Sequence, residues 1–192
     1  AGRLETLMPA VAHMTHMPSH IYIRTGKYQQ GIQVNNTAID GYRAYQQLYA
    51  PVSGNKGLYE VHNLHMKAAC ALQLASYNLA VRTATECRNS IDTAFLFAPP
   101  PFGNLAQYYY ETPLQAMLQF EAWSDILKQP MPEKRLAFSY ALYCFAKGLA
   151  NSKTGQVAEA QRRGDRLEPS PDTTARITMA SNHFSIRLLR GL

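Results

Sequence analysis

The chain has 192 residues, of which 46% are apolar and 17% charged, proportions that are ordinary for a globular protein with one core. Its formal net charge of +6 comes from basic residues spread along the sequence, without the aromatic-interleaved basic stripe of a nucleic-acid-binding surface. No apolar run reaches the roughly 20 residues that a membrane-spanning helix needs. We therefore expect no nucleic-acid partner and no membrane span.

The beginning of the chain has the character of a helix interior. Its first eight residues, Ala-Gly-Arg-Leu-Glu-Thr-Leu-Met, do not start with Met and contain no signal-peptide pattern. We expect residues 3–12 to form the last helix of a preceding unit, in a fragment or processed form of a longer chain. A cytoplasmic location is favoured, and export stays open because a leader could have been removed.

Helices are expected throughout, because strand signals are almost absent and apolar residues recur at intervals of three and four. Leu64, Ala68 and Leu72 are one example. Four positions mark tight turns between helices, and each is followed two residues later by a bulky side chain. The turn positions are Gly26, Ala75, Glu121 and Gly155, and the bulky residues are Tyr28, Tyr77, Trp123 and Val157.

Small residues recur at fixed distances from these turns, which predicts antiparallel helix pairs in close contact. They stand seven before, five after and twelve after the turns: Ser19, Gly31 and Ala38; Ala68, Ala80 and Cys87; Gly148 and Ala160. The third pair departs from the pattern, because the large residues Leu114 and Ile126 stand where the other pairs have small residues. Its second helix is expected to be cut short by Pro130 and Pro132.

This pattern resembles the tetratricopeptide repeat (TPR), most clearly at Ala-Lys-Gly-Leu-Ala-Asn-Ser-Lys-Thr-Gly-Gln-Val-Ala-Glu-Ala, residues 146–160. The resemblance implies a single all-α domain, a TPR-like α-α superhelix of antiparallel helix pairs with a C-terminal capping helix at about residues 173–190. The units are expected at about 12–49, 58–93, 104–130 and 135–168. The expected helix pairs are 17–25 with 28–49, 58–74 with 77–93, 104–120 with 123–129, and 135–152 with 155–167.

A second resemblance is carried by three segments that contain most of the histidines and two of the predicted turn positions. They are His-Met-Pro-Ser-His-Ile-Tyr-Ile-Arg-Thr-Gly-Lys-Tyr (16–28), Val-His-Asn-Leu-His-Met (61–66) and Phe-Glu-Ala-Trp-Ser-Asp-Ile-Leu (120–127). Together they are similar to a group of bacterial repeat proteins with an HMPSH motif. This likeness supports the fold and the joint occurrence of two histidine clusters, and it implies no reaction.

The two histidine clusters are the candidate site, because histidines recur thirteen and ten residues before the turn in consecutive units. Residues three or four apart on a helix share one face, so imidazoles from adjacent helices can converge on a metal ion. The candidate ligands are His13, His16, His20, His62, His65 and Glu111. Zinc, copper, nickel or iron would suit such a set. Since Pro18 disfavours helix before it, we expect His13 and His16 to lie in an irregular approach segment.

Other interpretations of the same residues stay open. The TPR resemblance implies a scaffold that binds a peptide or protein partner in its concave groove, with a metal-binding or metal-dependent catalytic groove as the alternative. The candidate groove residues are Tyr22, Tyr59, Asn63 and Tyr108. The histidines could equally form ordinary hydrogen bonds that tie neighbouring units together. An oligomerising module is a third option, suggested by Leu142, Phe145 and Leu149, and no oligomeric state is predicted.

The sequence contains no motif that assigns a reaction. It has no His-Glu-x-x-His, Gly-x-Ser-x-Gly, Walker or dinucleotide-binding signature. A metal-bound water with Glu111 or Glu60 as base is conceivable, but an enzyme is not the favoured interpretation. The three cysteines form no Cys-x-x-Cys pair and are expected to be small buried thiols.

Overall fold

The computed structural model of the chain describes residues 1–48 and 58–164. All regular structure in these ranges is helical and no strand occurs in them, which confirms the all-α prediction. The chain divides into two compact units, Ala1–Asp92 and Thr93–Leu192, where the sequence predicts one domain. Across the described ranges, no helix is both long and apolar enough to cross a membrane. The predicted capping helix at about 173–190 lies outside them.

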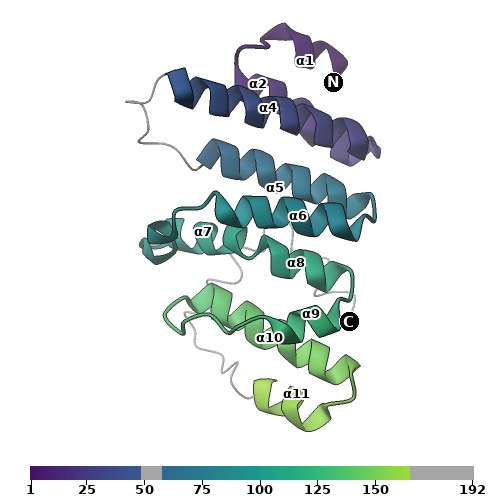
Figure 1. Ribbon diagram of the computed structural model, residues 1–192, viewed down its shortest axis with the longest axis vertical. Helices are drawn as coiled ribbons and strands as arrows, with labels where there is room; N and C mark the ends of the chain where they lie inside the picture. Colours follow the sequence, from purple (N-terminus) through teal and green to yellow (C-terminus); the bar gives the residue numbers. More distant parts are fainter. Residues whose placement is uncertain (49–57, 165–192) are drawn as a thin grey trace. The chain divides into compact units, whose positions relative to one another are not determined.

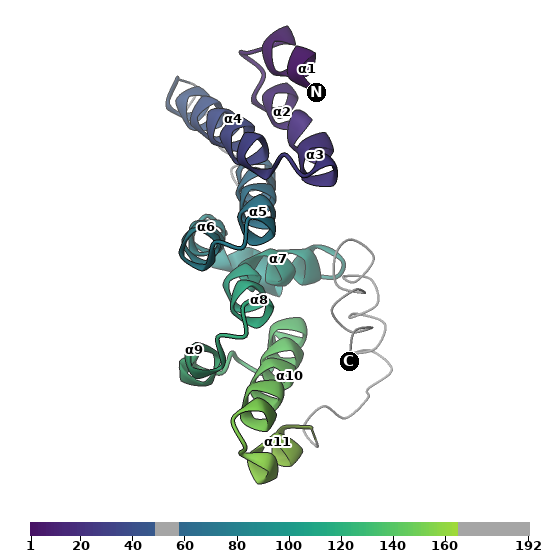
Figure 2. The ribbon, with the colours of Figure 1, turned by 90° about the vertical axis from the view of Figure 1, so that its right-hand side faces the viewer.

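The first unit is built around α5, which packs against both α4 and α6 (Figure 1, Figure 2). Shorter helices precede these three, and α2 and α3 both pack against α4. The elements are α1 (Gly2–Leu7), α2 (Ala12–His16), α3 (Pro18–Tyr22), the 3₁₀ turn η1 (Ile23–Thr25), α4 (Tyr28–Leu48), α5 (Leu58–Gln73) and α6 (Tyr77–Asn89).

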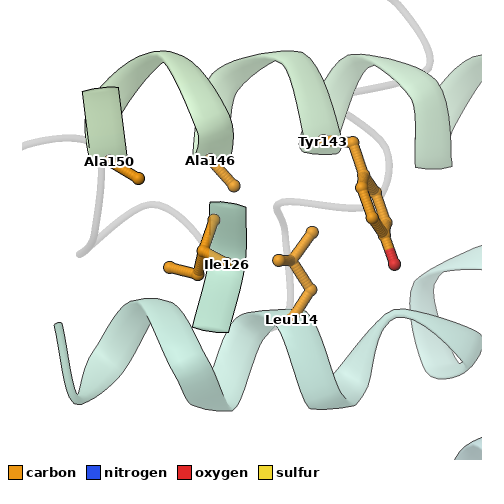
Figure 3. Packing of buried hydrophobic residues seen from close by; sticks show 5 residues of the cluster. All are labelled: Leu114, Ile126, Tyr143, Ala146 and Ala150. Atoms are coloured by element: carbon orange, nitrogen blue, oxygen red, sulfur yellow. The ribbon is translucent and has the colours of Figure 1, made fainter. Parts of the chain in front are cut away.

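The second unit is built around α10, which packs against α9 and α11 and more lightly against α7 and α8. Its elements are η3 (Thr93–Phe97), α7 (Phe102–Tyr110), α8 (Thr112–Gln119), α9 (Trp123–Lys128), α10 (Ala137–Lys153) and α11 (Val157–Gly164). The two bulky residues of the irregular pair, Leu114 and Ile126, point toward α10 in the core (Figure 3). They meet Ala146 and Ala150 there, so small partners on the next helix make room for the larger side chains.

The four predicted turns are confirmed, because every predicted turn residue has a left-handed backbone. The φ values are 74° at Gly26, 53° at Ala75, 54° at Glu121 and 81° at Gly155. A helix begins two residues after each of them, at Tyr28, Tyr77, Trp123 and Val157. A left-handed residue directly after a helix closes its last turn. Two of the four positions achieve this without glycine.

The tight helix contact at the small residue Gly31 lies between α4 and α5, which belong to different predicted pairs, and not across the first turn. A Cβ atom placed on Gly31 of α4 would lie 2.6 Å from the Sγ atom of Cys70 on α5, closer than non-bonded atoms allow. Ala68 and Ala80 occupy the corresponding positions around the second turn, and both are buried. The three cysteines are buried thiols, as predicted.

Three elements differ from those expected. The helix expected at residues 3–12 is α1, which ends at Leu7, and α2 begins only at Ala12. His13 and His16 lie on the short helix α2 rather than in an irregular segment, and α3 begins directly afterwards with Pro18 at its first position. Proline is tolerated there because the first backbone N–H groups of a helix have no intrahelical acceptor. The helix expected at 104–120 is divided at Glu111 into α7 and α8, since Pro113 cannot donate a helical hydrogen bond.

Candidate functional site

The candidate site in the first unit is a group of three imidazoles, His16, His20 and His62, which we call the histidine trio. His16 is the last residue of α2, His20 lies in α3 and His62 lies in α5. Met17 between α2 and α3 keeps a helical backbone and its N–H donates to the carbonyl of His13. His16 and His20 therefore share one face despite the proline between them, as residues four apart do on a continuous helix.

The three rings of the trio are in mutual contact. The Nε2 atoms of His16 and His20 are 3.0 Å apart. Ring centroids are 4.7 Å apart for His16 and His62, and 5.6 Å apart for His20 and His62, whose rings are stacked. One nitrogen from each ring can be chosen so that all three lie within 4.8 Å of one another.

Asn35 of α4 determines the tautomer of His16. Its side-chain N–H₂ donates to the carbonyl of Gly31 at 2.7 Å, so its Oδ1 is the atom that faces His16. That oxygen lies 2.7 Å from His16 Nδ1 and can only accept, which assigns the proton of His16 to Nδ1. Ser19 Oγ lies 3.4 Å from the same nitrogen. The lone pair of His16 is therefore on Nε2, where it accepts a hydrogen bond from His20.

Burial keeps the trio uncharged near neutral pH. The pKa of His16 is lowered to about 4, mainly by desolvation; the hydrogen bond to Asn35 opposes this shift, and the neighbouring histidines make a smaller contribution to it. Desolvation is also the main cause of the lowered pKa values of His20 and His62. For His20 the next cause is the positive charge of Arg24. Neutral imidazole is the form that ligates metal ions.

The spacing of the trio is compatible with a metal ion. Two nitrogens bound to tetrahedral zinc, each about 2.0–2.1 Å from the ion, lie about 3.3 Å apart. The 3.0 Å between His16 and His20 is close to this value. The ligand nitrogens of the three rings lie up to 4.8 Å apart, so the longest of these distances would have to shorten by up to about 1.5 Å when an ion binds. Rotation about side-chain torsions can supply this change.

Two of the other predicted histidine ligands lie near the trio but outside it. His13 is exposed on α2, with its ring centroid 6.0 Å from that of His16. It also makes an edge contact with Tyr59, at 5.7 Å between centroids. His65 is one helical turn beyond His62 on α5, partly buried, and burial lowers its pKa to about 4. Their roles as ligands stay predictions.

The predicted groove residues are distributed over both units. Tyr22 is buried and donates a hydrogen bond to the carboxylate of Glu5 in α1, rather than to a histidine. Asn63 is buried beside His62 in α5. Tyr108 and Glu111 belong to the second unit, where both are buried, and the ring of Tyr108 contacts those of Tyr109 and Phe138. A part for Glu111 in the histidine site stays a prediction.

Asn35 is the residue of the site that the sequence analysis misses. It is fully buried on the face of α4 that also carries Gly31 and Ala38. A polar amide within that apolar face is the one signal that could have identified it, because a buried amide requires a hydrogen-bond partner.

Comparison with known proteins finds no matching family model, no matching curated protein and no matching solved structure.

Proposed function

We propose that the first unit is a transition-metal-binding module in which His16, His20 and His62 hold one divalent ion, with zinc as the leading metal. The observation that carries this proposal is the convergence of three ligand nitrogens within 4.8 Å. They come from two stretches of chain that are far apart in sequence. Imidazole suits zinc, copper, nickel and iron, and three histidines without a thiolate or carboxylate form a common zinc ligand set.

The hydrogen bond from His16 to Asn35 supports the metal proposal over a purely structural role. A ligating histidine usually donates its second ring N–H to a protein acceptor, which fixes the tautomer and orients the ring. His16 has such an acceptor in Asn35, at 2.7 Å. The lone pair of its other nitrogen, Nε2, points to His20, and a metal ion would take the place of the His20 N–H that this lone pair otherwise accepts.

Metal titration of the chain without a histidine tag tests the proposal. After treatment with a chelator, we expect calorimetry and elemental analysis to find about one zinc ion per chain. Replacement of one ligand, as in His20→Ala or His62→Ala, should weaken binding by at least about tenfold. Circular dichroism should show unchanged helix content in these variants, since both rings are partly exposed.

His13→Ala is the matched control, because it removes a neighbouring exposed imidazole from outside the trio. It should leave zinc affinity nearly unchanged. Failure of the chain to bind zinc, cobalt, copper or nickel would overturn the proposal. Equal losses from His13→Ala and His20→Ala would also contradict the assignment of ligands.

We propose further that the helix pairs stack as a TPR-like superhelix. The support is the TPR resemblance, together with four left-handed turns that precede a helix start by the same two residues. Small-angle scattering of the chain tests this stacking, because a superhelix has a larger radius of gyration than a compact domain of equal length. A peptide or protein partner in its groove stays a prediction of the same resemblance.

A further inference from the structure

We infer that the metal ion held by the histidine trio keeps one coordination position open, and that this position takes a small carboxylate anion that enters past His13 and Tyr59. The inference rests on the proposed metal function. It adds the class of ligand that the site receives and the side from which this ligand arrives.

The open position follows from the number of ligands. Zinc is four-coordinate in most protein sites, and sites with three protein ligands leave the fourth position to an exogenous ligand. Among the described residues, the trio is the only group of three or more histidine, cysteine or acidic side chains whose ligand atoms come this close. The group has three members, so a tetrahedral ion bound to it has one free position.

The direction of access follows from the exposure of the rings. His16 is 0% exposed and its Nδ1 side is closed by Asn35 and Ser19. His20 and His62 are partly exposed. The neighbouring His13 is exposed, and Tyr59, whose ring contacts it, is 52% exposed. Because the ring contacts of His13 link the exposed Tyr59 to the buried His16, we take this side as the direction of access to the trio.

The charge of the ligand follows from the charges around the site. Three neutral imidazoles leave the full positive charge of a divalent ion uncompensated. Arg24 follows His20 by four residues where α3 continues directly into η1, so it places a further positive charge about one helical turn from His20. The nearby carboxylate of Glu60, next to Tyr59 on α5, forms an ion pair of 2.7 Å with Arg43. An anion at the open position would therefore be attracted both by the ion and by Arg24.

The cobalt-substituted chain provides the test, since the visible d–d absorption of Co²⁺ reports changes in its ligands. We expect acetate and azide to change this spectrum saturably, whereas acetamide, the neutral analogue of acetate, should not. Arg24→Gln should weaken acetate binding by about three- to tenfold without altering cobalt affinity. Lys27→Gln, which removes another exposed cation nearby in the chain, is the matched control and should have no such effect.

The outcomes separate this inference from the function on which it depends. If cobalt does not bind, the proposed metal function itself fails. If cobalt binds but acetate and azide leave its spectrum unchanged, the inference of an open coordination position is contradicted, while the proposal of metal binding is still supported. If His13→Ala alters the cobalt spectrum and creates an anion response that the unmodified chain lacks, His13 is the fourth ligand and the inference is overturned. Equal responses to acetate and acetamide would contradict the preference for an anion.

Discussion

Asn35 Oδ1 lies 2.7 Å from Nδ1 of His16, while the amide nitrogen of the same Asn35 donates to the carbonyl of Gly31 at 2.7 Å. One buried side chain of α4 thus connects His16 of α2 to the backbone of α4 itself. Because both ends of the amide are engaged, its orientation is fixed, and with it the proton position of His16.

Asn35→Ala should therefore weaken zinc binding by about 10- to 100-fold, because it removes the acceptor that holds the tautomer and orientation of His16. The loss of a partner for the buried N–H should also lower the free energy of unfolding by about 1–3 kcal/mol. Calorimetry and urea unfolding measure the two effects. Asn36→Ala, at the adjacent exposed position of α4, should change neither. Undiminished zinc affinity in Asn35→Ala would show that the tautomer of His16 does not depend on this bond.

Gly31→Ala should destabilise the first unit by about 1–3 kcal/mol, because the new methyl group would overlap Cys70 Sγ at 2.6 Å. Cys70→Ala in the same chain should recover part of this loss, which a double-mutant cycle in urea unfolding measures. Gly41→Ala is the control within the same helix. Its new Cβ has only Ala12 Cβ within reach, at 3.9 Å, so the gain in helix propensity should stabilise the chain by up to about 1 kcal/mol. Equal effects of the two substitutions would contradict the tight contact of α4 with α5.

The metal-free chain should lose stability as the pH falls from about 6.5 to about 4. Burial lowers the folded-state pKa values of His16 and His65 to about 4, below the 6.5 of the unfolded chain. In this window the unfolded state binds more protons, so the free energy of unfolding falls with falling pH, by at most about 1.4 kcal/mol per pKa unit and group. Urea unfolding with a chelator present, at several pH values across the window, measures the slope. A stability independent of pH there would mean that these two rings are not desolvated.

Glu121→Gly should stabilise the second unit by about 1 kcal/mol, because glycine adopts the left-handed φ of 54° without the steric cost of a Cβ atom. Gln119→Gly, at the exposed last residue of α8, is the matched control and should destabilise by up to about 0.5 kcal/mol. Thermal unfolding of the two variants compares them. A destabilising Glu121→Gly would show that the left-handed turn is not the relevant feature of this position.

The turns could be predicted from the sequence because they depend on short-range rules. A turn residue and a bulky residue two positions later act within one helix pair, so Ala75 and Glu121 could be identified without glycine. The division of the predicted 104–120 helix was equally local, since Pro113 lies inside it. Its effect was not anticipated because Leu114 and its neighbours continue an apolar helical pattern across the break.

The candidate site could be predicted only in part, because it depends on contacts between distant segments. The helical spacing of His16 and His20 indicates a shared face, but the choice of His62 rather than His65 as their neighbour depends on how α5 packs. The partnership with Asn35 joins residues nineteen positions apart on different helices, which no periodicity encodes. The sequence therefore identifies the histidines that could form the site, and the packing of the helices determines which of them lie close together.

The trio also joins two parts of the chain that lie about forty residues apart, since His20 precedes the first turn and His62 follows the long helix α4. An ion that bridges these rings would close that loop and restrict the unfolded chain much as a cross-link does. The N-terminal helices α2 and α3 would then resist fraying and proteolysis in proportion to the supply of metal. The resistance of these two helices to proteolysis would then report how much metal ion is available to the protein.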